Sequence, residues 1–149
     1  MRHIRIPLVV LLATLALTAV PAQAPASARG TMLAQINAVR AYVGVHPLRL
    51  SRSLNTSSSV FARRLMRRDV FGHASRIQAS SRFRMLGEIL ELHGGHRPQV
   101  GATVRAWLRS PGHRRVLLSR KYYWIGLGRS AGSFRGRRAT IWVGQFGRR

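Results

Sequence analysis

The absence of cysteine is the feature that most constrains how this 149-residue chain folds. Small exported domains commonly depend on disulfides, and the N-terminus of this chain has the pattern of an export signal. Without cysteine, the folded chain must be held by core packing alone, and thiol chemistry and Cys-ligated zinc are excluded. The length predicts one domain, long enough to bury a core.

The first 28 residues are predicted to be a secretory signal peptide. A basic start, residues 1–5, precedes the 15-residue apolar run IPLVVLLATLALTAV, and the small-residue cleavage patterns AQA and ASA follow it. We place the cut after Ala28, because a cut after Ala24 would leave Pro25 at the new N-terminus. Residues 29–149 then form a single secreted domain without a transmembrane span, and a retained N-terminal anchor is the alternative.

The charge balance is extreme. The chain has 26 Lys and Arg against 3 Asp and Glu, a net charge of +23, and residues 29–149 keep 24 of these basic residues and all three acids. A GC-rich genome explains arginine in place of lysine but does not explain the missing acids. The charge therefore favours adhesion to anionic envelope polymers or lipid head groups. Nucleic-acid binding and antimicrobial action rest on charge alone, since no stacking stripe or recognition motif accompanies it.

Apolar spacing predicts helices first and strands last. We expect helices over residues 31–43, capped by Thr31, over 51–69 and over 98–109, and a further short helix capped by Ser110. The segments YYWIGLGR and ATIWVGQF read as two strands joined by SAGSFRGRR. The expected fold class is therefore α+β, with helices first and a C-terminal β-hairpin.

Three residues are candidates for a metal site. Glu88 lies in the apolar segment MLGEIL, where a carboxylate needs a partner or a cation because burying it alone is costly. His73 follows a predicted helix end and His113 falls in the first turn of the short helix. Two His and one Glu suffice for an open zinc-type site with water in the remaining position. A hydrogen-bonded structural cluster of the same residues is the alternative.

His113 is expected to be neutral. The partial positive charge of the helix N-terminus, together with Arg109, Arg114 and Arg115, disfavours imidazolium. A neutral imidazole is a metal ligand or a hydrogen-bond hub.

Two further patterns are weaker. His93 and His96 in HGGH are either a second metal site or solvated loop histidines. GRSAG, residues 128–132, fits the G-x-S-x-G elbow of serine hydrolases, but that elbow needs a strand before it, a helix after it, and an acid and a His further on. Because a second strand follows and no acid or His comes after His113, Ser130 is interpreted as a turn residue.

In sequence order, several segments together resemble the CAP superfamily, which contains cysteine-rich secretory proteins, antigen 5 and plant pathogenesis-related proteins, in a cysteine-free bacterial form. The resemblance covers about residues 33–147. The segments that carry it are INAVR, HPLRL, RLMRRDVFGH, GEIL, WLRSPGHR, IGLG and WVGQFG.

The resemblance implies an α-β-α sandwich with a central cleft lined by two His and two Glu. In some members this cleft binds divalent metal, and zinc is the metal that we expect here. His73, Glu88 and His113 match three of these positions, while Ser110 stands at the second Glu and Ile89 at the usual Asn. Trp107 and Ser110 are expected at the cleft, with Trp107 closing the core and Gly112 letting the chain pass close to its neighbours. Glu91 is a further cleft candidate, potentially on the same helical face as Glu88.

Two functions from different classes follow. The first is a secreted, non-enzymatic binding module with a metal-capable cleft, a basic exterior that retains it at the envelope, and a small apolar ligand, as the resemblance implies. The second is a metal-dependent hydrolase of peptides or esters that uses a water in the same cleft. The missing second carboxylate favours binding over turnover, because a general base is lost with it.

Overall fold

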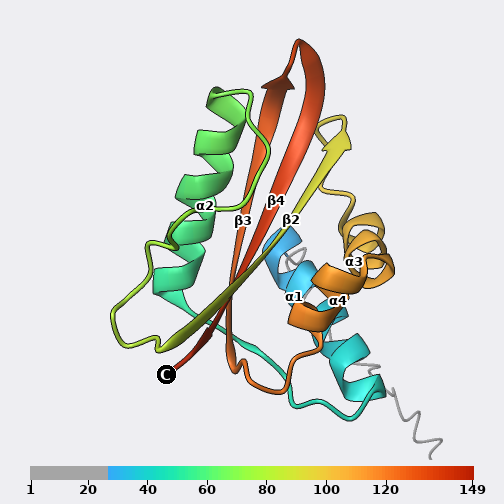
Figure 1. Ribbon diagram of the computed structural model, residues 1–149. Coiled ribbons are helices and arrows are strands. Elements are labelled where there is room, and N and C mark those ends of the chain that lie inside the picture. The colour runs from blue at the N-terminus through green and yellow to red at the C-terminus, as the bar shows by residue number, and fades with distance from the viewer. Residues whose placement is uncertain (1–26) are drawn as a thin grey trace, which may run out of the picture.

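The computed structural model describes residues 27–149, so the predicted signal peptide lies outside the described residues except for its last two positions. Eight elements follow one another (Figure 1): α1 (Ala28–Tyr42), β1 (Arg49–Leu50), α2 (Arg52–Arg67), β2 (Met85–Gly94), α3 (Val100–Arg109), α4 (Pro111–Leu117), β3 (Trp124–Phe134) and β4 (Arg137–Arg148). Within residues 27–149, no helix combines the length and the apolar character that a membrane crossing requires.

The four strands form one mixed sheet in the order β1-β3-β4-β2. β1 is parallel to β3, whereas β4 is antiparallel to both β3 and β2. Glu88 of β2 is paired with Gln145 of β4, and Gly94 at the other end of β2 is paired with Ala139. The expected α+β class and terminal hairpin are therefore confirmed.

The helices form layers on the two faces of the sheet (Figure 1). α2 covers one face, and α1, α3 and α4 lie together on the other. Each face has its own apolar cluster: Phe61 and Leu65 of α2 pack with Leu90 and Val143, while Trp107 of α3 is buried in the cluster on the opposite face. This three-layer arrangement, built on core packing without disulfides, is the expected α-β-α sandwich.

Two glycines of β3 allow α2 to pack directly against the sheet. Gly126 and Gly128 alternate with buried Ile125 and Leu127, so both glycines face α2. A Cβ atom at Gly126 would overlap the backbone of Leu54, and a Cβ atom at Gly128 would overlap the backbone of Ser58. The IGLG segment is therefore a contact surface for the helix backbone.

Several predicted boundaries were wrong. α1 begins three residues before Thr31, because the side chain of Ser27 accepts a hydrogen bond from Gly30 N at 3.1 Å and caps the helix. The hairpin strands are longer than expected, and Ser130 lies in β3 rather than in a turn. The turn between the strands is confined to Arg135 and Gly136, which both have positive φ angles, as tight hairpins require.

Candidate functional site

Glu88 is the centre of a hydrogen-bond network at the β2 edge of the sheet. Its side chain is only 6% exposed. Oε1 accepts from the backbone N of Ala74 at 2.9 Å and lies 3.1 Å from His73 Nδ1, while Oε2 accepts from Gln145 Nε2 at 2.8 Å. Both carboxylate oxygens are thus satisfied by neighbours that hold them in place.

The network continues into the layer between the sheet and α2. Gln145 is 1% exposed, and its Oε1 lies 3.4 Å from the hydroxyl of Ser58. That hydroxyl lies 2.7 Å from the carbonyl of Leu54, one helical turn earlier in α2. Gln145 was missed in the sequence, although a lone amide within the apolar segment ATIWVGQF was a signal that could have identified it.

The hydrogen bond to Glu88 fixes the chemistry of His73. A carboxylate only accepts hydrogen bonds, so His73 Nδ1 must carry the proton and donate it to Glu88. In the neutral ring, His73 Nε2 is then the acceptor nitrogen, and the side chain is 59% exposed. A carboxylate behind one ring nitrogen is the usual way in which a metal-binding imidazole is oriented.

His113 approaches His73 from α4. The two ring centroids are 6.4 Å apart, with an angle of 65° between the ring planes. His113 Nδ1 is buried and has no hydrogen-bond partner among the described residues. Burial, followed by the nearby His73, lowers the pKa of His113. This lowered pKa agrees with the expected neutral imidazole. The main cause of the shift, however, is desolvation rather than the helix terminus and the nearby arginines.

The α3–α4 junction differs in detail from its prediction. Ser110 is the N-cap position of α4, with Pro111 at the first helical position, yet its side chain makes no capping hydrogen bond. A Cβ atom at Gly112 would meet nothing within 4 Å, so the expected close approach at Gly112 is wrong.

Glu91 and Trp107 lie away from Glu88. Residues 85–94 form a strand rather than a helix, so Glu88 and Glu91, three positions apart, point to opposite faces of the sheet. The expectation that they share a helical face was therefore wrong. Burial raises the pKa of Glu91, and His93 and Arg109 oppose that shift.

Trp107 is fully buried in the core, where its Nε1 donates to the carbonyl of Leu90 at 3.1 Å.

The donor set fits a cation bound by two imidazoles better than one bound by three protein ligands. Across residues 27–149, no three His, Cys, Asp or Glu side chains gather as a ligand group. His73, Ala74 and Gln145 take three of the roughly four acceptor sites of the Glu88 carboxylate, so Glu88 is better placed to orient His73 than to ligate. His73 Nε2 and the two ring nitrogens of His113, of which Nδ1 is buried, make no hydrogen bond among the described residues and are the nitrogens that remain for a cation.

The HGGH histidines are separate from this site. His96 Nε2 lies 3.0 Å from the carbonyl of Gly132, and His93 Nδ1 lies 3.2 Å from the carbonyl of Gly94. His93 Nε2 is buried without a partner among the described residues. Each ring therefore contacts a backbone carbonyl, that of the next residue for His93 and that of Gly132 in β3 for His96.

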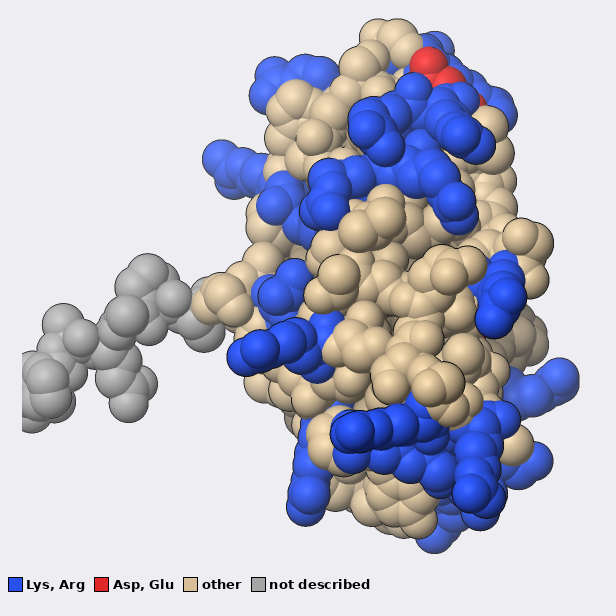
Figure 2. Space-filling model, turned by 90° about the vertical axis from the view of Figure 1, so that its left-hand side faces the viewer, with Lys and Arg blue, Asp and Glu red and all other residues tan. Residues whose placement is uncertain are grey.

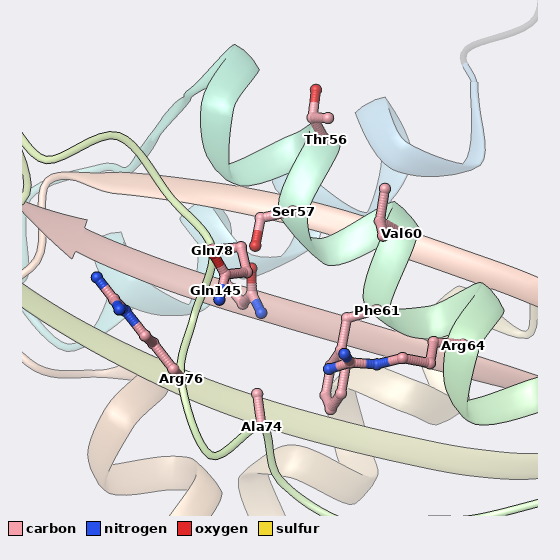
Figure 3. A pocket seen from close by; sticks show the side chains of 9 residues that line it. All are labelled: Thr56, Ser57, Val60, Phe61, Arg64, Ala74, Arg76, Gln78 and Gln145. Carbon is pink, nitrogen blue, oxygen red and sulfur yellow. The ribbon is translucent and has the colours of Figure 1, made fainter. Parts of the chain in front are cut away.

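A pocket of about 220 Å³ adjoins the network between α2 and the segment that follows His73 (Figure 3). Val60, Phe61 and Ala74 give it apolar walls, and Gln145 lies at its sheet side. The guanidinium of Arg64 lies over the Phe61 ring, 5.0 Å from its centroid. The remaining lining residues are Thr56, Ser57, Arg76 and Gln78. Sequence reasoning missed this pocket, because its walls come from three separate segments.

The sequence of residues 33–146 matches the model of the CAP family, described as the cysteine-rich secretory protein family. The match covers most of the chain and includes His73, Glu88 and His113. The chain therefore belongs to the CAP family.

Solved structures share this fold. An outer surface protein from Borrelia burgdorferi superposes with a TM-score of 0.68 at 20% identity, over 82% of this chain and 92% of that one. An extracellular SCP-domain protein from Bacillus anthracis gives 0.63 at 18% identity, over 80% of this chain and 39% of that one. Venom allergen-like protein 4 from Schistosoma mansoni gives 0.56 at 9% identity, over 80% and 86%. No curated protein matches the chain in sequence.

Proposed function

We propose that the chain is an exported, non-enzymatic binding protein whose cleft holds a divalent cation between His73 and His113 and whose basic exterior retains it at the cell envelope. The observation that carries the proposal is the hydrogen-bonding of Glu88. Its carboxylate is held by three neighbours, and one of them is His73, which it positions. Two relatives of the same fold are described as an outer surface protein and as an extracellular protein, which supports export.

The same hydrogen bonds argue against turnover. A general base needs a lone pair directed at the proton that it removes. Both oxygens of Glu88 accept hydrogen bonds from fixed donors, and Ser110 stands where the family has its second cleft carboxylate. Glu91 cannot replace it, because the side chain of Glu91 projects from the other face of β2. The site is therefore suited to binding.

His73 and His113 would hold the cation through one ring nitrogen each. Burial lowers the pKa of His113, which favours the neutral form that ligates. Zinc, when bound, would supply a Lewis acid and an acidified water. Glu88 would keep His73 in one tautomer and one orientation.

Hydrolysis assays test the non-enzymatic part. Peptide and ester libraries are incubated with the exported protein in the presence of added zinc and, in parallel, with chelator. We expect no hydrolysis above that of a His113→Ala variant. Zinc-dependent hydrolysis that His113→Ala abolishes would contradict the proposal and establish the hydrolase alternative.

The pocket beside Gln145 is the proposed site of a small apolar ligand. Its walls are apolar, and Arg64 and Arg76 among its lining residues favour a ligand with an acidic end. An anilinonaphthalene sulfonate probe combines these two properties. Ala74→Trp fills the pocket and keeps the backbone N–H that Glu88 accepts, so probe fluorescence should fall by more than half. The matched control is Ala41→Trp on the exposed side of α1, and an equal effect of both variants would contradict the assignment.

Retention at the envelope rests on charge. The one ion pair within residues 27–149 joins His73 to Glu88, so no described Lys or Arg side chain is neutralised by a carboxylate. Such a surface binds polyanions through counterion release, which salt reverses. Elution from anionic wall polymer or acidic vesicles should therefore follow a salt gradient. Retention that salt leaves unchanged would contradict this part of the proposal.

A further inference from the structure

The end of the molecule that carries the β3–β4 turn combines arginine with exposed apolar side chains. The end of α2 and the hairpin turn meet there, because Asp69 Oδ1 accepts a hydrogen bond from Arg135 N at 2.7 Å. We call this end the arginine tip. Its residues are Arg64, Arg67, Arg68, Val70, Phe71, Arg135, Arg137 and Arg138, all of them exposed.

Two consecutive apolar residues project from this tip. Val70 is 54% exposed and Phe71 is 41% exposed, and only Asp69 separates them from Arg67 and Arg68 in the chain. A hollow of about 340 Å³ is lined by Val70 together with Arg64 and Arg68 at the end of α2. Large exposed apolar side chains among charges mark a contact surface more often than isolated ones do.

The opposite side of the turn also places arginine beside apolar side chains, which here are buried or half-buried. A hollow of about 530 Å³ lies between the ends of β2 and the hairpin, with Leu92 and Phe134 beside Arg135, Arg137 and Arg138. The guanidinium of Arg135 lies over the Phe134 ring, 5.4 Å from its centroid. Figure 2 shows Lys and Arg gathered at both ends of this face, with a band of other residues between them, and acidic atoms visible at the upper end, where the tip lies.

We propose that the arginine tip docks on a bilayer surface rich in anionic phospholipid, with its guanidinium groups on lipid phosphates and Val70 and Phe71 in the interfacial region. This proposal rests on the proposed retention at the envelope and names its partner. Charge complementarity selects an anionic surface. The apolar pair selects a bilayer over a dissolved polyanion, because only the bilayer offers an apolar phase for Val70 and Phe71.

The other end of the molecule is the internal control. Met85 of β2 is paired with Arg148, and Trp124 of β3 with Gly147, so Arg82, Arg84 and Lys121 lie near the end of the sheet far from the turn. The ten residues of β2 span about 33 Å. This is several times the screening length of about 8 Å at physiological salt. Charges at the two ends therefore act on a nearby membrane independently.

Site-specific fluorophores report which end enters the bilayer. The chain has no cysteine, so Val70→Cys and Tyr123→Cys each give a single labelling site in the exported protein. Tyr123 is 51% exposed at the opposite end. With vesicles of phosphatidylglycerol and phosphatidylcholine, a nitrobenzoxadiazole label at Val70→Cys should brighten and shift to shorter wavelength. The label at Tyr123→Cys should not. The reverse pattern would overturn the proposal.

Matched charge variants measure the contribution of the tip. Arg67→Gln, Arg137→Gln and Arg138→Gln together remove three exposed charges from the tip, and Arg82→Gln, Arg84→Gln and Lys121→Gln remove three from the other end. At about fivefold for each basic residue near the surface, the tip variant should lose about a hundredfold in vesicle partitioning. The opposite-end variant should lose less than about fivefold, and Phe71→Ser about tenfold. Circular dichroism confirms that all variants fold.

The outcomes separate this proposal from the retention on which it rests. Equal losses of vesicle partitioning in the two triple variants would overturn docking through the arginine tip, while charge-based retention would still hold. Binding of the exported protein to soluble polyphosphate but not to anionic vesicles would also overturn docking on a bilayer alone. Absence of binding to both polyphosphate and anionic vesicles would contradict charge-based retention, and docking through the arginine tip would fail with it.

Discussion

Gln145 Nε2 donates a 2.8 Å hydrogen bond to Glu88 Oε2 between two paired strands, which joins the candidate site to the packed layer under α2. Gln145→Leu removes this donor and leaves a nearly buried carboxylate oxygen without its partner. We expect a loss of about 1–3 kcal/mol in the free energy of unfolding, measured with urea. Gln78→Leu, in the same pocket, is the control and should change stability by less than about 0.5 kcal/mol. A free energy of unfolding that Gln145→Leu leaves unchanged would show that the network does not stabilise the fold.

Glu91 gives the protein a predictable pH dependence. Burial raises the pKa of Glu91 in the folded state, so the folded chain binds a proton more readily than the unfolded chain just above pH 4.5. The protonated form of Glu91 therefore stabilises the folded state, and this stabilisation is lost as the pH rises from 4.5 through the folded-state pKa. Glu91→Gln should be more stable than the wild type at pH 7, and the difference should shrink toward pH 4 in parallel urea titrations. A difference that is constant with pH would contradict the assignment.

Gly126 and Gly128 are predicted to tolerate no side chain. Either glycine-to-alanine substitution places a methyl group in the backbone of α2, which cannot move without opening the core. We expect destabilisation of about 3 kcal/mol or more in thermal or urea unfolding. Gly112→Ala in α4 is the matched control, because that position is open and alanine favours a helix. Destabilisation by Gly112→Ala equal to that of Gly126→Ala would contradict the packing described.

Arg40 is a structural cation without a carboxylate. It is fully buried, its pKa is lowered to about 10 by burial, and its guanidinium donates to four carbonyls: His46, Leu117, Ser119 and Tyr122. Arg40→Met leaves these carbonyls unpaired and should cost about 3 kcal/mol or more. Arg40→Lys keeps the charge without the planar fork and should cost less.

Exposed Arg105→Met is the control for Arg40 and should change stability by less than about 0.5 kcal/mol. If Arg40→Met were as mild as Arg105→Met, the four contacts would contribute nothing to folding. Unfolding in urea at neutral pH distinguishes these results.

The fold class could be predicted from the sequence more fully than the interactions between its side chains. Apolar spacing located α2 and the hairpin strands, because such periodicity is local. It did not show that Gly126 and Gly128 touch α2, that Gln145 holds Glu88, or that Arg40 is buried, since each depends on segments far apart in the chain. Glu88 and Glu91 were placed on one helical face because a short apolar segment with charges fits either a helix or a strand.

The central claim is that His73 and His113 form a cation site that Glu88 organises. Calorimetric titration of zinc into the protein tests this site, beside the variants His113→Ala, Glu88→Gln and, as control, His96→Ala. We expect one zinc per chain, no binding to His113→Ala, affinity about 10–100-fold lower for Glu88→Gln, and unchanged binding to His96→Ala. Absence of stoichiometric binding to the wild type, or binding that survives in His113→Ala, would contradict it.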